Sequence, residues 1–386
     1  MSKYIPLSEP MLKGNEWQYV KECLDSTWIS SAGKYVNLFE EKIEEYTNTR
    51  YAVSCINGTS ALQVALKLAG VIPGDEVIVP TITFIAPVNA VRYNGAEPIF
   101  MDADNYFNLD VEKTISFIQN ETIYKNGFTY NKKNNKRITA LIPVHVYGNA
   151  VWLDELIRVC EERNISIVED AAESMGTVYS KGKYSGKHTG TIGELGCLSF
   201  NGNKIITTGG GGMIITNNAL LADKANYITR QAKDDGVRFI HNEIGYNFRL
   251  TNIQAALGVA QLEQLSFFIE RKLEIYNQYQ AALESINGLT LANVPDFAVN
   301  NHWMNLLQID TEVYGKDRET IMVKLEENGI QTRPVWNLNH LQKPYRDCQN
   351  YKVETAEKLI NNSLCLPSST NLSDQDLNKV TDTLSG

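Results

Sequence analysis

Short apolar runs rich in β-branched residues alternate with helical patterns between residues 51 and 217, and this alternation limits the chain to few folds. It is typical of a mostly parallel sheet covered by helices on both faces. We therefore expect a large α/β domain. Its seven expected strands are 51–56, 75–80, 97–102, 138–146, 165–170, 195–200 and 211–216, and its expected helices are 60–70, 86–93, 111–119 and 153–164.

The pattern changes near residue 255, and a chain of 386 residues is long enough for more than one core. Residues 255–286 have apolar side chains at three- and four-residue spacing, which predicts a long helix able to link domains. We expect a large domain over 1–255, with a segment 1–35 that can pack on the smaller domain, and a smaller α+β domain over 256–386 that contains a strand at 302–310. The polar stretch 124–137 contains Asn-Gly and is interpreted as an exposed hairpin.

Charge and composition exclude several classes of protein. With 36 Lys and Arg against 45 Asp and Glu, the net charge is −9, which argues against nucleic acid or an anionic membrane surface as partners. No apolar run approaches the ~20 residues that cross a bilayer, so we expect a cytoplasmic protein. The six cysteines and five histidines lie far apart in the sequence, which favours reduced thiols and no metal site.

A short polar segment, Asn57-Gly58-Thr59-Ser60, follows one expected strand and begins one expected helix. Free backbone N–H groups and two hydroxyls at a helix N-terminus suit a phosphate. The alternative is an ordinary helix N-cap, because Ser and Thr are common at that position.

Asp170 ends an expected strand in the stretch IVEDAAES. Ligands of open α/β sheets gather beyond the carboxyl ends of the strands, where this carboxylate can face a cationic ring nitrogen. It can equally be a capping residue.

Ser199 and Lys204 follow the next expected strand, and the four glycines 209–212 come after them. Glycines allow a tight turn beside a ligand. The segment is not a nucleotide-binding P-loop, because the lysine precedes the glycines.

Pyridoxal 5'-phosphate requires three features together: a phosphate-binding site, an aspartate for its ring nitrogen and a lysine amine. With these residues in place, the chain resembles the DegT/DnrJ/StrS type of nucleotide-sugar aminotransferases, which have the aspartate-aminotransferase-like fold type I of PLP-dependent transferases. The resemblance extends over essentially the whole chain, through the stretches IPLSEP, VPTITFIAPVNAV, EDAAES, SFNGNK, GYNFRLTNIQAA and TRPVW.

The resemblance implies a role for each matching residue. Lys204 corresponds to the Schiff-base lysine and catalytic base, and Asp170 to the partner of the pyridine nitrogen. Phe84 corresponds to the aromatic residue that stacks on the ring, and Glu173 stands near the ring hydroxyl, where many relatives have Gln. Asn247 corresponds to an asparagine that reaches the phosphate of the neighbouring subunit, which implies a homodimer with shared sites. The phosphate itself would be held by Gly58, Thr59, Ser60 and Ser199.

The sequence predicts substrate contacts less well than cofactor contacts. The resemblance places Arg333 and His340 at the edge of the sugar and nucleotide pocket, although Arg333 can equally form a surface ion pair. Trp28 and Ser31 are candidates for the entrance. His145 can be either a pocket residue or a core histidine whose ring nitrogens are hydrogen-bonded.

Within the family, the sequence is most similar to the branch that acts on nucleotide-linked 2-acetamido-4-keto-2,6-dideoxyhexoses in the legionaminic-acid pathway. The implied reaction moves the amino group of L-glutamate to the C4 ketone of a UDP- or GDP-linked sugar. Enzymes that make bacillosamine, perosamine or other 4-amino sugars share much of this pattern. The closer match lies in the stretches 187–213, 241–256 and 329–345.

Two further hypotheses compete with an aminotransferase. A pyridoxamine-dependent sugar dehydratase of similar fold has histidine in place of the lysine, so Lys204 argues against it. A non-catalytic PLP-binding regulatory protein would not need Lys204, Asp170 and Ser199 together.

Overall fold

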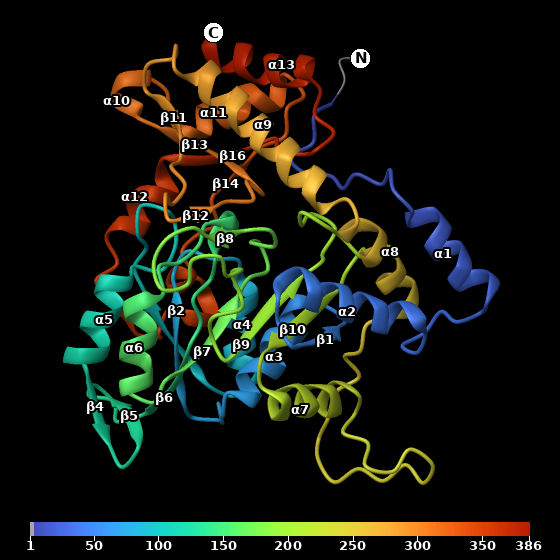
Figure 1. The fold of residues 1–386 in the computed structure, drawn as a ribbon. Helices are drawn as coiled ribbons and strands as arrows, with labels where there is room; N and C mark the ends of the chain where they lie inside the picture. Colours follow the sequence, from blue (N-terminus) through green and yellow to red (C-terminus); the bar gives the residue numbers. More distant parts are fainter. Residues whose placement is uncertain (1–3) are drawn as a thin grey trace.

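The computed structural model describes residues 4–386, and a ten-stranded sheet forms the centre of its larger part (Figure 1). The strands follow the order β1-β10-β9-β7-β6-β2-β3-β15, and β4 and β5 extend from β6. All neighbours from β9 to β15 are parallel, whereas β10 is antiparallel to both β1 and β9. The strand bounds are β1 Tyr51–Cys55, β2 Glu76–Pro80, β3 Glu97–Met101, β4 Thr122–Lys125, β5 Phe128–Asn131, β6 Arg137–Leu141, β7 Ser166–Asp170, β9 Leu195–Ser199, β10 Gly212–Thr216 and β15 Asn350–Tyr351.

Both faces of this sheet are buried, as continuous apolar strands require. Val77 and Val79 of β2 belong to one apolar core, and Ile78 between them belongs to another. The first core includes apolar residues of α2, α3, α4 and α8, and the second includes those of α5 and α6. The helices of this part are α1 Glu16–Asp25, α2 Lys34–Thr47, α3 Gly58–Leu68, α4 Ile85–Tyr93, α5 Val111–Asn120, α6 Asp154–Glu162, α7 Ala219–Thr229 and α8 Asn252–Leu262.

The mostly parallel α/β sheet expected from the sequence is confirmed, and all seven expected strands are present. The sheet has three further strands. Two of them, β4 and β5, form a hairpin over residues 122–131, where the sequence predicts a hairpin at 124–137, with Asn126 at φ 53° and Gly127 at φ 81° in the turn. These positive φ values are what a two-residue hairpin turn of type I′ demands. The third, β15, is only two residues long and gives no periodic signal.

The smaller part contains a four-stranded antiparallel sheet in the order β11-β13-β16-β14. Helices α9, α11 and α13 pack on it around leucine and isoleucine side chains. The elements are β11 Leu289–Leu291, β13 Asn305–Ile309, β14 Arg333–Pro334, β16 Ser363–Leu366, α9 Leu265–Leu283, α10 Thr311–Tyr314, α11 Arg318–Glu327, α12 Thr355–Asn361 and α13 Asp374–Ser385; the short strands β8 Val178–Tyr179 and β12 Ala298–Val299 pair with each other.

Two expectations for this half of the chain need correction. The long helix expected over 255–286 is two helices, α8 and α9, interrupted at Glu263 and Gln264. The strand expected over 302–310 begins only at Asn305, because His302 has a φ of 49°, which no strand accommodates.

Segments from both ends of the chain pack against parts distant in sequence. The Ile5 N–H donates to the Gly329 carbonyl at 2.9 Å, so the start of the chain lies on the smaller part. Tyr351 of β15 pairs with Met101, so a segment from the C-terminal third extends the large sheet. The domain division at residue 255 stays a prediction, and residues 1–3 of the expected segment 1–35 lie outside the described residues.

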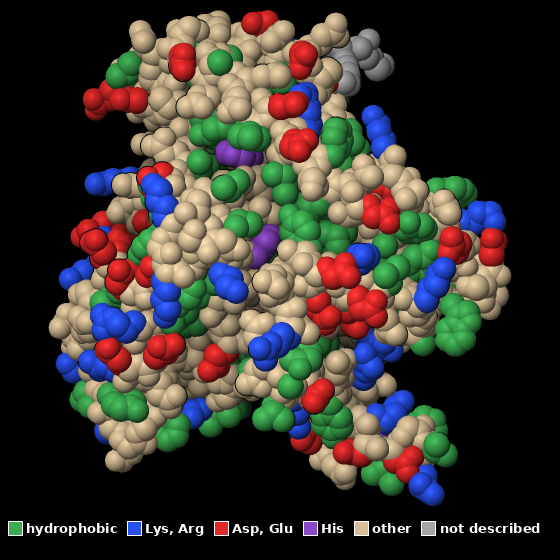
Figure 2. Space-filling model, in the orientation of Figure 1, with side chains coloured by type: hydrophobic (Ala, Val, Ile, Leu, Met, Phe, Trp, Pro, Cys, Tyr) green, Lys and Arg blue, Asp and Glu red, His purple; other side chains and the backbone are tan. Residues whose placement is uncertain are grey.

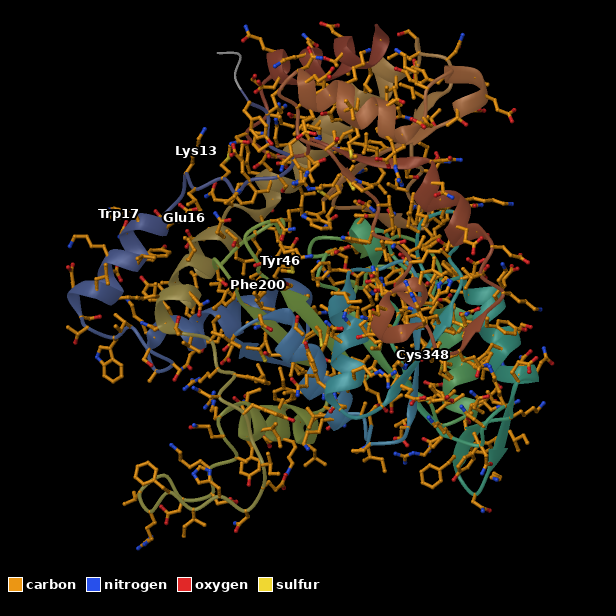
Figure 3. All side chains as sticks on the ribbon, turned by 180° about the vertical axis from the view of Figure 1, so that it is seen from behind. Lys13, Glu16, Trp17, Tyr46, Phe200 and Cys348 are labelled. Atoms are coloured by element: carbon orange, nitrogen blue, oxygen red, sulfur yellow. The ribbon has the colours of Figure 1, made fainter. Side chains whose placement is uncertain are left out.

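The surface carries exposed apolar side chains in two regions. A long segment after α7 projects from the molecule (Figure 1), with Val237, Phe239 and Ile244 between 70 and 85% exposed. Figure 2 shows hydrophobic and charged side chains mixed on this projecting segment. Trp17 of α1 is 79% exposed and points away from the body of the protein (Figure 3). Within residues 4–386, no helix has the length and apolar character of a membrane span.

Candidate active site

A cavity of about 320 Å³ lies beyond the carboxyl ends of the central strands. Asp170 ends β7 and Ser199 ends β9, and the N-terminus of α3 lies beside them. The structure thus brings together most of the cofactor residues expected from the sequence. The lining residues include Gly58, Thr59, Phe84, Asp170, Glu173, Ser199 and Lys204, together with Asn57, Asn201, Asn203, Trp303 and Trp336.

The N-terminus of α3 is shaped for close contact with a ligand. The Asn57 side chain accepts a 2.8 Å hydrogen bond from the Ser60 N–H, which caps the helix, so capping and ligand binding coexist here. A Cβ on Gly58 would lie 2.9 Å from the Ser199 Cβ, so glycine is needed where the two segments meet. The helix dipole and its free N–H groups favour an anion at this end.

Asp170 is buried, and burial raises its pKa to about 6. One carboxylate oxygen accepts a hydrogen bond from the Ala172 N–H at 3.0 Å. A buried carboxylate with so little support is stabilised by a cation beside it. The residue therefore suits the protonated nitrogen of a pyridine ring.

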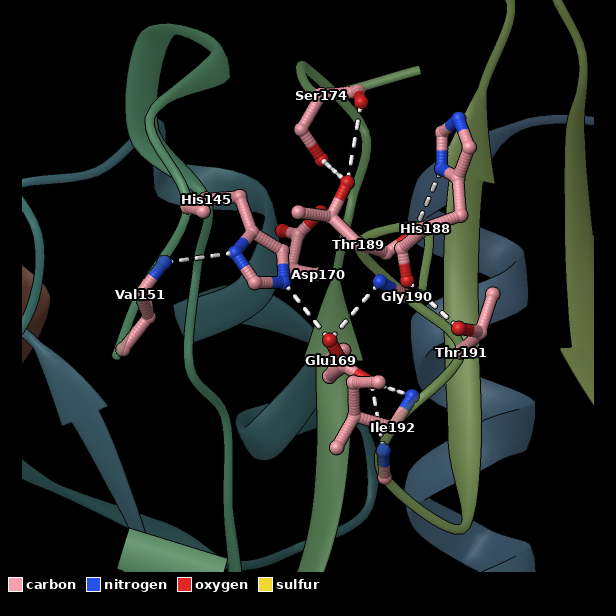
Figure 4. Close-up of polar contacts among 12 residues, drawn as sticks. His145, Val151, Glu169, Asp170, Ser174, His188, Thr189, Gly190, Thr191 and Ile192 are labelled. Carbon is pink, nitrogen blue, oxygen red and sulfur yellow. Dashed lines mark hydrogen bonds and ion pairs between the residues drawn. The ribbon is translucent and has the colours of Figure 1, made fainter. Parts of the chain in front are cut away.

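The side chain of the neighbouring Glu169 belongs to a separate hydrogen-bond network (Figure 4). Its carboxylate contacts His145 Nε2 at 2.9 Å and accepts hydrogen bonds from the Gly190, Ile192 and Gly193 N–H groups. Nδ1 of His145 accepts a hydrogen bond from the Val151 N–H. His145 is thus a satisfied core histidine, and its network fixes the end of β7.

Lys204 follows β9 in a turn closed by its own N–H and the Asn201 carbonyl, 3.0 Å apart. Its Nζ donates to Glu173 Oε1 at 3.2 Å and lies 4.3 Å from the centre of the Trp303 ring. The other Glu173 oxygen accepts a hydrogen bond from the Tyr147 N–H at 2.8 Å. Both a carboxylate and an aromatic face therefore contact the lysine amine.

Aromatic side chains form much of the remaining wall. Phe84 precedes α4, and its ring is 52% exposed. Trp336 lies 6.3 Å from Phe84, measured between ring centres, and stacks on the buried Tyr147 at 4.5 Å. A ring ligand in the cavity would meet apolar faces.

Other expected site residues lie elsewhere. Asn247 and Ser31 line a second hollow with Arg230 and Arg249. Ser60, whose N–H donates to the Asn57 cap of α3, lies next to the cavity without lining it. The expected substrate residues Trp28, Arg333 and His340 also do not line the cavity.

Each of these three has other surroundings. The Trp28 carbonyl accepts a hydrogen bond from Asn252, and the Trp28 ring is 60% exposed. Arg333 is exposed on β14, and buried His340 contacts the Thr81 hydroxyl at 2.7 Å through Nδ1. Their roles in substrate binding stay predictions.

The sequence reasoning missed Trp303 and Trp336. Trp336 lies in the quoted motif TRPVW, but nothing in the motif shows that its ring reaches the cavity. Trp303 was included in a strand, and only the turn at His302 carries it to Lys204. No local signal predicts that turn.

The fold and the cavity define a PLP-dependent transferase of the aspartate-aminotransferase type. The residues fit the cofactor, with a helix N-terminus for its phosphate, buried Asp170 for its ring nitrogen and Lys204 for its aldehyde.

Comparison with known proteins identifies the family. The model of the DegT/DnrJ/EryC1/StrS aminotransferase family matches residues 10–385, and the chain belongs to this family. It is 39% identical to a GDP-perosamine synthase of Escherichia coli O157:H7, over 97% of this chain and 96% of that protein. It is 36% identical to a GDP-perosamine synthase of Caulobacter vibrioides, with the same coverage.

A solved structure supports the same assignment. A DegT/DnrJ/EryC1/StrS aminotransferase from Brucella abortus superimposes with a TM-score of 0.85 at 27% identity, covering 96% of this chain and 94% of the other. The protein is a PLP-dependent sugar aminotransferase.

Proposed function

We propose that this enzyme transfers the amino group of L-glutamate to the C4 ketone of a GDP-linked 4-keto-6-deoxyhexose. The observation that carries the proposal is the ion pair of Lys204 and Glu173 inside the cavity that Asp170 and the α3 N-terminus also line. Three relatives at 39, 36 and 34% identity are named GDP-perosamine synthase, which favours the perosamine type over the 2-acetamido substrate of the legionaminic-acid branch.

When bound, PLP withdraws electrons from the substrate carbon that loses its proton. Asp170 would keep the ring nitrogen protonated, because an opposite charge favours the charged form. Phe84 would pack on the ring. The phosphate would be held by Ser199, by the backbone N–H groups of Gly58 and Thr59, and by the hydroxyls of Thr59 and Ser60.

Lys204 is the one amine on the cavity wall among the described lining residues. It would bond to the cofactor at rest and, once displaced by an amino substrate, move a proton to and from the reacting carbon. Glu173 and the Trp303 ring fix the position of its Nζ. The same lysine would act in both halves of the reaction, with glutamate and then with the keto sugar.

The second hollow supports a homodimer with shared sites. Asn247 is exposed and lies there beside Arg230 and Arg249, rather than in the cavity of its own chain. The projecting segment that leads to Asn247 carries exposed apolar side chains, which a second copy would cover.

The experiment is an assay of purified protein with L-glutamate and matched GDP- and UDP-linked 4-keto-6-deoxy sugars, with and without a 2-acetamido group. We expect a 4-amino product with the GDP-linked sugar that lacks the acetamido group. A faster reaction with a 2-acetamido sugar would instead support the legionaminic-acid or bacillosamine type. No amino transfer to any of these sugars would contradict the proposed reaction.

A further inference from the structure

Lys272, in the middle of α9, is a buried lysine outside the cavity. Its side chain is 4% exposed, and no carboxylate of the described residues forms an ion pair with it. Burial lowers its pKa to about 7. Lysine is rarely buried without a charged partner, because its amine then loses hydration without compensation. The position therefore calls for a specific use of the amine.

The amine joins three segments of the chain. Lys272 Nζ donates to the Trp303 carbonyl at 3.0 Å and to the Ser368 carbonyl at 2.7 Å. The Ser368 N–H in turn donates to the Leu7 carbonyl, and its hydroxyl accepts from the Asn305 N–H. Lys272 thus ties α9 to the residues before β13 and to those after β16.

Trp303 is the point where this junction meets the cavity. Its N–H donates to the Asn301 side chain, and its indole N–H donates to the Asn203 carbonyl at 2.7 Å. Its ring lies 4.3 Å from Lys204 Nζ. Lys272 therefore holds one end of Trp303, and the residue before Lys204 holds the other.

The backbone at this point needs such a restraint. His302 adopts a φ of 49°, a left-handed conformation that is unfavourable for a residue with a side chain. The preceding Asn300 side chain accepts a hydrogen bond from the His302 N–H. Removal of the Lys272 amine would leave the Trp303 carbonyl buried without this donor and free the turn to relax.

We propose that Lys272 is a positioning residue that holds the Trp303 ring over the Lys204 amine and so couples the linking helix α9 to the catalytic lysine. The proposal depends on the catalytic role proposed for Lys204. Among the described residues of α9, Lys272 alone forms a hydrogen bond with Trp303.

A double-mutant cycle on the PLP-loaded enzyme tests this coupling. The variants are Lys272→Met, which keeps length but removes the donors, Trp303→Phe, and both together. We expect Lys272→Met to lower kcat about tenfold in the wild type but less than about twofold in the Trp303→Phe background. An equal factor in both backgrounds, or no effect in the wild type, would overturn the proposal.

Two further variants separate positioning from general damage. Tyr279→Phe removes a hydrogen bond from α9 to the Pro367 carbonyl without touching Trp303, and we expect it to leave kcat within about twofold. Lys272→Arg keeps donors for the two carbonyls, and we expect it to restore part of the lost rate. If Lys272→Met does not fold, Lys272→Arg with and without Trp303→Phe completes the cycle: we expect a smaller loss of kcat in the wild type that shrinks further in the Trp303→Phe background, and an equal loss in both backgrounds, or none in the wild type, would overturn the proposal.

An optical measurement keeps this test apart from the proposed reaction. The near-ultraviolet circular dichroism of Trp303 is obtained as the difference between wild type and Trp303→Phe. We expect Lys272→Met to lose most of that difference signal and Tyr279→Phe to retain it. A signal unchanged by Lys272→Met would refute the proposal, even if no sugar substrate were turned over.

Discussion

Two groups of residues line the same cavity but are built in different ways. The strand-end group consists of Gly58, Asp170, Ser199 and Lys204, each within a few residues of a strand of the large sheet. The aromatic group consists of Trp303 and Trp336, which lie in connections of the C-terminal half. The first group is positioned by local turns on a buried sheet, and the second by contacts with residues far away in the sequence. Chemistry should depend mainly on the first group, and the geometry of Lys204 on the second.

The largest effect is expected within the strand-end group. Lys204→Ala removes the cavity amine, so we expect kcat to fall by at least about a thousandfold, because no other lining residue offers an amine to bond the cofactor and move the proton. Circular dichroism and thermal unfolding should show an intact fold. Borohydride reduction followed by peptide mass analysis should attach cofactor mass to Lys204 in the wild type. A variant that retained its rate would contradict the division between the two groups.

Asp170→Asn should separate activity from stability. We expect kcat to fall by about a hundredfold, because a neutral side chain no longer favours the protonated ring nitrogen.

The same substitution should stabilise the protein without cofactor. Burial raises the pKa of Asp170 above its usual value, to about 6, so above that pH the folded state holds a costly charge that Asn lacks. We expect unfolding in urea at pH 8 to require about 1 to 3 kcal/mol more free energy than in the wild type. Lower stability of the cofactor-free variant would show that Asp170 already has a counter-charge in the protein.

The two groups also differ in how far the sequence predicts them. Asp170, Ser199 and Lys204 can be predicted from the sequence, because the strand ends of a parallel sheet meet at one edge. A residue that follows an expected strand is therefore expected at the site. Trp303 is not legible, since its place depends on the left-handed turn at His302 and on Lys272, 31 residues earlier in the chain. Strand β15 was missed for the same reason, because its two residues pair with β3 across about 250 positions.

Lys272 supports the aromatic group, and its titration should be visible in the stability of the protein. Burial lowers its pKa to about 7 from an ordinary value of 10.5, so the unfolded chain binds more protons between these two pH values. The free energy of unfolding should therefore rise with pH across this window, by at most about 1.4 kcal/mol per unit. Lys272→Met should lose this rise relative to the wild type in urea unfolding from pH 7 to 10.

His302 beside it provides a separate window. Burial, with the nearby charge of Lys272, lowers the pKa of His302 to about 4, so its contribution to stability rises between pH 4 and 6.5 and is complete before Lys272 titrates. An identical slope in wild type and Lys272→Met above pH 7 would mean that Lys272 remains charged in the folded protein.

The smallest effect is expected at Glu173, which lies between the two groups. Its carboxylate bonds Lys204 through one oxygen and the Tyr147 N–H through the other, and Tyr147 stacks on Trp336. Glu173→Gln keeps an oxygen for the Tyr147 N–H but turns an amide N–H₂ toward the Lys204 amine. In the cofactor-free protein, we expect a loss of about 1 kcal/mol in the free energy of unfolding, because a partly buried ion pair is broken.

With PLP bound, the Lys204 nitrogen is bonded to the cofactor and no longer needs the Glu173 carboxylate as the partner of a free ammonium group. Glu173→Gln then removes a contact that the enzyme can spare. We therefore expect kcat to change by less than about threefold, since the Tyr147 hydrogen bond that holds the aromatic group is kept. Glu173→Ala is the matched variant, because it removes both contacts and should lower kcat further by freeing Tyr147. If Gln and Ala were equally slow, the carboxylate charge itself would be needed for turnover, and Glu173 would belong with the strand-end group rather than between the two.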